Sequence, residues 1–149
     1  MSNLLEAVET AQDNIERLAD PGELRAAAEQ IMSYARKYEA RSILAASPAA
    51  ERLVGALLSE YHQLVALTTH VAGAQAEVLI VDINLASGMS VAQAARVART
   101  AGAQHVHAVV LHQLTAVAAR ASDCGVDVLD VLGPVPPERQ GSTTSSGLA

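Results

Sequence analysis

One short segment, residues 78–90, has the residue types and spacing of a binding site. The apolar run from Val78 to Val81 is typical of a buried strand, and Asp82 follows it directly. Five residues later, Ser87 to Ser90 (SGMS) precedes an alanine-rich helical stretch. This loop offers hydroxyls, a glycine for a tight turn and the free N–H groups of a helix start, which suit one phosphate group. A carboxylate that accepts hydrogen bonds from hydroxyls beside such a loop predicts a phosphorylated ribose as ligand.

The elements that must position this segment alternate along the chain. Apolar runs predict strands, and segments with a helical period or helix-start signals predict helices. Such strands and helices, in alternation, form a parallel sheet that is covered on both faces and binds ligands at the carboxyl ends of its strands. The sequence therefore predicts an α/β fold, a three-layer, doubly wound and mainly parallel sheet preceded by N-terminal helices. Strands are expected at 43–46, 63–67, 78–81, 106–111 and 126–132, and helices at 4–18, 23–39, 49–60, 90–100 and 115–121.

The length and composition predict one domain. The 149 residues are 50% hydrophobic, with 30 alanines and no Phe or Trp, so the core must consist of closely packed Ala, Val, Leu and Ile. We expect this domain to span residues 1–133. Residues 134–149, rich in Pro, Ser and Gly, are expected to be a disordered tail.

The charge pattern bears on the partners and the compartment. Ten basic and sixteen acidic residues give a net charge of −6, and the cations are not clustered, so we expect no nucleic-acid partner. No apolar run approaches the roughly 20 residues of a membrane span, so no membrane partner is expected either. The single cysteine, Cys124, and the absence of a signal-peptide pattern predict a cytoplasmic protein. Leu4, Leu5 and Val8 form one stripe of the first helix, which either closes the core or makes a homodimer contact.

Residues 78–90 (VLIVDINLASGMS) resemble the ribose-5-phosphate signature of type I phosphoribosyltransferases, and the similarity continues through the following helix and strand. Upstream, ARSILAASPAAERLVGALL is similar to the first core strand, pyrophosphate turn and helix of that family. The resemblance covers roughly residues 24–132. It implies a small phosphoribosyl ligand and Mg²⁺, with Asp82 as the metal ligand. It assigns the ribose and phosphate to Asp82, Ala86, Ser87, Gly88, Met89 and Ser90, and the pyrophosphate to Ala46, Ser47, Pro48 and Ala49.

The chain also departs from the family pattern. Ile83 stands where the family has a second acid, and Asn84 cannot replace it because neighbouring residues of an extended segment point in opposite directions. Ala49 and Ala50 replace the usual glycines of the pyrophosphate turn. The segment 68–77 is about one-third as long as the family's catalytic loop requires and holds no Lys or Arg. These departures predict a protein that binds phosphoribosyl pyrophosphate or a nucleoside 5′-monophosphate in a regulatory or catalytically impaired role.

Alternative functions stay open. The chain could be an active phosphoribosyltransferase of nucleotide metabolism, with an oligomer partner that supplies the missing loop and cation. It could also be an interaction module with a vestigial site. DINL followed by ASGM further resembles the phosphoacceptor strand of response-regulator receiver domains, with Asp82 as acceptor. Against this, the first strand ends in Ala45-Ala46-Ser47 instead of an acidic pair, and Gly133 stands where a receiver has its lysine.

Some other polar residues are weaker candidates. His105 and His107 share a face of one strand and could ligate a metal, but solvated or sheet-packed histidines are the commoner case. Cys124 lacks a general base and is expected to be a packed thiol. The remaining candidates are His62 and His70 beside the second strand, and Asp127 and Asp130 at the last one.

Overall fold

The structure is a computed structural model, and it describes residues 2–60, 65–66, 77–115 and 119–133. Its helices and strands follow the order that the sequence predicts, except that the described residues between the last two strands form no helix. In chain order they are α1 (Ser2–Arg17), α2 (Pro21–Lys37), β1 (Ser42–Ala45), α3 (Ala50–Glu60), β2 (Val65–Ala66), β3 (Glu77–Leu85), α4 (Met89–Thr100), β4 (His105–Gln113) and β5 (Val128–Val131).

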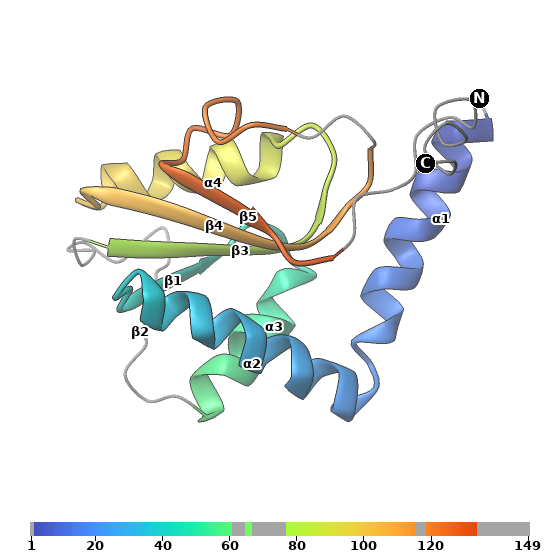
Figure 1. The fold of residues 1–149 in the computed structure, drawn as a ribbon, viewed down its shortest axis with the longest axis horizontal. Helices are drawn as coiled ribbons and strands as arrows, with labels where there is room; N and C mark the ends of the chain where they lie inside the picture. Colours follow the sequence, from blue (N-terminus) through green and yellow to red (C-terminus); the bar gives the residue numbers. More distant parts are fainter. Residues whose placement is uncertain (1, 61–64, 67–76, 116–118, 134–149) are drawn as a thin grey trace, which may run out of the picture.

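The strands form one five-stranded sheet in the order β2-β1-β3-β4-β5, and every neighbouring pair is parallel. Helices α2 and α3 cover one face of this sheet and α4 covers the other, while α1 stands across the end at which β3 leads into α4 (Figure 1). This arrangement confirms the predicted three-layer, parallel α/β fold. It also places the carboxyl ends of the central strands beside α1.

Two hydrophobic clusters hold the layers together. The odd-numbered residues Leu79, Val81 and Ile83 of β3 pack under α2 and α3, whereas Val78 and Ile80 pack under α4. The chain can build both clusters from small aliphatic side chains because the helices bury alanines at helical spacing. In α2 these are Ala27, Ala28 and Ala35, beside Ile31 and Met32.

The break between the first two helices is built as the sequence predicts. Asp20 has an extended backbone, its Oδ2 accepts a hydrogen bond from the backbone N–H of Glu23 at 3.0 Å, and Pro21 occupies the first turn of α2. These are the features of a capped helix start. Gly102 follows α4 with a φ of 113° and donates its backbone N–H to the carbonyl of Arg99, as expected for a helix stop.

Two predicted elements differ from the structure. Strand β3 continues past Asp82 to Leu85, because Asn84 and Leu85 pair with residues of β4. The helix expected at 115–121 is wrong in its described part, since Ala119 and Arg120 are not helical and hydrogen-bonded turns follow them up to Gly125. Of the expected strand 63–67 the structure describes only Val65–Ala66, which form β2. The remainder of that strand, His62, His70 and the predicted tail at 134–149 lie outside the described residues.

Helix α1 is most buried toward its C-terminal end. Asn14 and Leu18, which directly follows the helix, are buried, whereas Leu4, Leu5 and Val8 are more than half exposed. The C-terminal half therefore closes the core, and the homodimer contact expected of the stripe stays a prediction. Within the described ranges, no helix has the length and apolar character needed to cross a membrane.

Candidate functional site

Asp82 lies inside β3, close to the carboxyl end of the sheet. The residue is only 5% exposed. Its Oδ1 accepts a hydrogen bond from the Ser47 hydroxyl at 2.7 Å and another from the backbone N–H of Ile83 at 2.8 Å. Burial raises the pKa of Asp82, and the two hydrogen bonds oppose this effect. The carboxylate is therefore held in one orientation in a weakly solvated place.

Asp82 and the loop after β3 surround one small hollow of about 110 Å³. The structure thus brings together every residue that the sequence assigned to ribose and phosphate. Asn84, Leu85 and Val91 also line this hollow. Asn84 lies on the same side of the strand as Asp82 because the two residues are separated by one position.

The loop between β3 and α4 has, at its centre, a backbone conformation that only glycine adopts easily. Gly88 has a φ of 87°, and a Cβ built on it would lie 2.6 Å from the Cys124 sulfur. The N–H of Met89 donates to the Ser87 hydroxyl oxygen at 3.3 Å, while Ser87, Met89 and Ser90 are exposed. Gly88 therefore lets the start of α4 face the hollow, with two hydroxyls beside it.

The predicted pyrophosphate turn lies next to Asp82 but is largely engaged within the protein. The N–H of Ala46 donates to the carbonyl of Val81 at 2.9 Å, and Pro48 has no N–H to offer. The Ser47 hydroxyl donates to Asp82 and accepts from the N–H of Ala50 at 3.3 Å. The Ala46 N–H and the Ser47 hydroxyl are therefore already engaged within the protein, which leaves fewer groups of this turn to bind a pyrophosphate.

A second hollow, which the sequence analysis missed, lies on the other side of β3. It measures about 220 Å³ and is lined by residues that include Pro48, Ala49, Arg52 and Ile83. Arg52 is thus a cation beside the pyrophosphate turn. The sequence could have predicted this position, because Arg52 follows Pro48 by about one helical turn and must therefore lie near the same strand ends.

The paired histidines lie at the opposite, amino-terminal edge of the sheet. His105 Nδ1 and His107 Nε2 both contact the Glu77 carboxylate, at 2.7 and 2.8 Å. The His107 ring stacks on Tyr38 at 4.2 Å, and the Tyr38 hydroxyl donates to Asp130 at 2.6 Å. These residues thus cross-link β3, β4, β5 and the end of α2, which is a structural role.

Cys124 and Asp127 also have structural surroundings. Cys124 is fully buried against Gly88, and burial raises the pKa of its thiol. Asp127 accepts a hydrogen bond from the N–H of Val106 at 2.8 Å and lies 3.5 Å from Arg99. Neither residue lines the hollow at Asp82.

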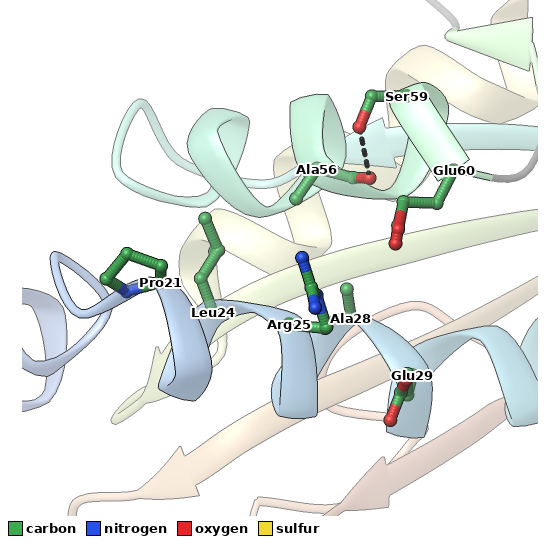
Figure 2. Close-up of a pocket in the computed structure, with 8 residues that line it drawn as sticks. All are labelled: Pro21, Leu24, Arg25, Ala28, Glu29, Ala56, Ser59 and Glu60. Carbon is green, nitrogen blue, oxygen red and sulfur yellow. Dashed lines mark hydrogen bonds between the residues drawn. The ribbon is translucent and has the colours of Figure 1, made fainter.

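A further hollow, of about 330 Å³, lies between α2 and α3 and away from the strand ends. Figure 2 shows Arg25 and Leu24 of α2 directed toward α3, with Glu29 and Glu60 at one end. Its lining residues come from these two helices alone: Pro21, Leu24, Arg25, Ala28, Glu29, Ala56, Ser59 and Glu60. This hollow lacks the convergence of strand ends that characterises ligand sites in parallel sheets.

Comparison with solved structures identifies the architecture. The UMP synthase of Leishmania donovani matches with a TM-score of 0.63 and 22% identity, over 79% of this chain and 28% of that one. The orotate phosphoribosyltransferase of Aeropyrum pernix matches with a TM-score of 0.55 and 17% identity, over 76% of this chain and 73% of that one. No protein-family model and no curated protein matches the sequence.

This chain has a type I phosphoribosyltransferase-like fold. The resemblance noted in residues 78–90 is therefore confirmed at the level of fold. The predicted ribose and phosphate residues of this phosphoribosyltransferase-like chain line one hollow, but their roles stay a prediction. The chain spans 28% of the UMP synthase chain that it matches.

The hollow at Asp82 does not by itself fit a Mg²⁺ ion. The described residues contain no group of three or more His, Cys, Asp or Glu side chains that could hold a metal. Asp82 already uses Oδ1 for two hydrogen bonds, and Ile83 in the position of the second acid packs into the core. Because Mg²⁺ prefers several oxygen ligands, an ion at this site would depend on oxygens of the ligand.

The burial of Asp82 has a consequence for stability. A carboxyl whose folded-state pKa is raised contributes stability at low pH, and this contribution is lost as the pH rises through the folded pKa. Asp82→Asn keeps an acceptor for Ser47 and Ile83 but removes the buried charge. We expect this variant to be more stable than the wild type at pH 7 and equal to it near pH 3.

Urea unfolding between pH 3 and pH 8 measures this difference. The exposed Asp13→Asn is the control, because it makes the same substitution at the surface of α1, and we expect it to change the stability by no more than about 0.5 kcal/mol. A difference between wild type and Asp82→Asn that stays constant with pH would contradict the prediction.

Proposed function

We propose that the chain binds phosphoribosyl pyrophosphate or a nucleoside 5′-monophosphate and that its role is regulatory or catalytically impaired. The observation that carries the proposal is the hollow shared by Asp82, Asn84 and residues 86–90. The phosphate would lie at the start of α4, where N–H groups and the hydroxyls of Ser87 and Ser90 can donate. The ribose hydroxyls would donate to Asp82.

The impaired role is supported by three features of the chain. Ile83 stands in the position of the second acid of the family pattern but has no carboxylate, and its side chain is buried. The Ser47 turn is engaged with Asp82 and Ala50. The segment 68–77 contains no Lys or Arg, so it cannot supply a cation to the departing pyrophosphate.

The binding proposal is tested by calorimetric titration with phosphoribosyl pyrophosphate and uridine 5′-monophosphate, with and without Mg²⁺. We expect Ser87→Ala combined with Ser90→Ala to weaken binding by about 1–3 kcal/mol, because donors to a charged group are lost. Ser59→Ala is the matched control, since Ser59 is an exposed serine of α3 whose hydroxyl donates only to a carbonyl of its own helix, at 2.9 Å. Equal affinity in the double variant and the wild type would contradict the assignment of the phosphate to this loop.

Arg52 favours a second candidate, an active phosphoribosyltransferase of nucleotide metabolism. It lines the hollow beside Pro48 and Ala49, where a cation could stabilise a departing pyrophosphate. Release of pyrophosphate from phosphoribosyl pyrophosphate in the presence of a nitrogen base separates the two functions. Measurable transfer by the chain alone would overturn the impaired role and leave the binding proposal intact. The homodimer and the cytoplasmic location also stay proposals.

A further inference from the structure

Helix α1 is fastened to the strand that carries Asp82. Asn14 donates its Nδ2 hydrogen to Asn84 Oδ1 at 2.8 Å, and Asn84 donates its own Nδ2 hydrogen to the carbonyl of Ala11 at 3.1 Å. Asn14 is 5% exposed, so this amide pair is shielded from water. Because Asn84 also lines the hollow at Asp82, α1 is attached to the wall of the proposed ligand site.

The C-terminal end of α1 and Leu18, which directly follows it, lie between separate hollows at the carboxyl edge of the sheet. Asn14, Arg17 and Leu18 line a hollow of about 160 Å³ that reaches His112 and Gly133 of the β4–β5 side. Leu18 also lines the 220 Å³ hollow at Arg52, so it stands between the two. Sites for small organic ligands usually measure about 300–1,000 Å³, and the 110 Å³ hollow at Asp82 is well below that range.

We propose that α1 is a lid over the part of the nucleotide site at Asn84, beside the exposed loop of residues 86–90, and that it must move away from Asn84 before a whole nucleotide can enter. This inference rests on the proposed function and adds its regulation. In the closed state the side-chain amide of Asn84 forms hydrogen bonds with Asn14 and Ala11 of α1. In the open state its amide and the neighbouring hollows become available to the part of the ligand beyond the phosphate.

The connection between α1 and α2 allows such a movement. Asp20 lies between the helices in an extended conformation and caps α2 through Glu23, so α2 keeps its own cap when α1 moves. The N-terminal half of α1, with Leu4 and Val8 exposed, adds few buried contacts that would have to break. The hydrogen bonds at Asn84 and the apolar contacts of Ile15 and Leu18 therefore hold α1 in the closed position.

The test uses the full chain and uridine 5′-monophosphate as the probe. Because Asn14→Ala removes one hydrogen bond of the closed state, we expect it to bind the probe about three- to tenfold more tightly than the wild type. Gln12→Ala is the control, since Gln12 is exposed on α1 and bonds only to Glu16, at 3.2 Å. In the wild type, hydrogen exchange of the α1 backbone should become faster when the probe binds, while exchange in α2 stays unchanged.

The outcomes separate the lid from the function. If the wild type binds the probe and α1 exchange is unchanged or slower, the lid is refuted and the proposed function stands. Binding that is weaker in Asn14→Ala than in Gln12→Ala also refutes the lid. If Asn14→Ala fails to fold, exchange in the wild type decides alone. Absence of binding to wild type and Asn14→Ala alike overturns both proposals, whereas binding to Asn14→Ala alone supports the lid.

Discussion

Gly88→Ala is expected to destabilise the protein by about 2–4 kcal/mol and to abolish nucleotide binding. An alanine with a φ of 87° is strained, and its Cβ would lie 2.6 Å from the Cys124 sulfur, which is fully buried and cannot withdraw easily. The loop between Leu85 and Met89 must then shift, which moves the N–H groups of α4 away from the hollow. Urea unfolding measures the loss of stability, and calorimetric titration measures the loss of binding.

Two further variants define the cause of this effect. Gly55→Ala is the matched control, because Gly55 lies in helix α3 with nothing within 4 Å of the added Cβ. It should stabilise the chain by about 0.5–1 kcal/mol. Combining Gly88→Ala with Cys124→Ala should recover the steric part of the loss and leave the backbone strain. Equal stability losses for Gly88→Ala in the presence and absence of the Cys124 sulfur would show that the collision is unimportant.

Ile83→Asp, which restores the second acid of the family pattern, is expected to destabilise the chain by about 3–5 kcal/mol without creating a Mg²⁺ site. Ile83 is almost fully buried in the cluster under α2 and α3, on the opposite side of β3 from Asp82. The variant loses a packed aliphatic side chain and buries a carboxyl group in its place. Unfolding in urea gives the stability, and titration with MgCl₂ gives the metal affinity.

Ile83→Val is the conservative comparison, with an expected loss of about 0.5–1.5 kcal/mol. The informative contrary result is an Ile83→Asp variant that loses less than about 1 kcal/mol and binds Mg²⁺. It would show that an acid at this position turns toward Arg52 in the neighbouring hollow and that the departure from the family pattern is readily reversed. The expected result would instead show that Ile83, which replaces the second acid of the family pattern, is needed for the packing of the core.

Together these variants separate two properties of the segment 78–90. Gly88 serves the shape of the loop between β3 and α4, so its replacement should remove stability and the proposed binding together. Ile83 serves the core, so its replacement should affect stability first. Asp82 lies between the two, because its buried charge lowers stability at neutral pH while its oxygen orients Ser47 and faces the ligand hollow.

The local patterns of the chain predicted most of the fold. The apolar run at 78–81, the break between the helices expected at 4–18 and 23–39, and the end of the helix expected at 90–100 depend on neighbouring residues alone, and each appears where expected. The convergence of Asp82 with residues 86–90 was predictable for the same reason, because a strand followed by a short loop and a helix keeps both ends of the loop close together. The sequence also held a signal for the longer strand β3. Residues 82–85 alternate between polar and apolar side chains, as half-buried strands do, which predicts that the strand continues to Leu85.

Only the tertiary structure decided how accessible this site is. The contact between Asn14 and Asn84 joins residues 70 positions apart, and the position of Arg52 beside Ile83 depends on how α3 packs on the sheet. Strand β3 is longer than its apolar run because β4 pairs with its polar end. These features arise from long-range pairing and packing, which local sequence patterns do not encode. The sequence by itself thus determined a phosphoribosyltransferase-like sheet with a glycine-containing loop after β3, and long-range packing determined that α1 is hydrogen-bonded to the strand that leads into this loop.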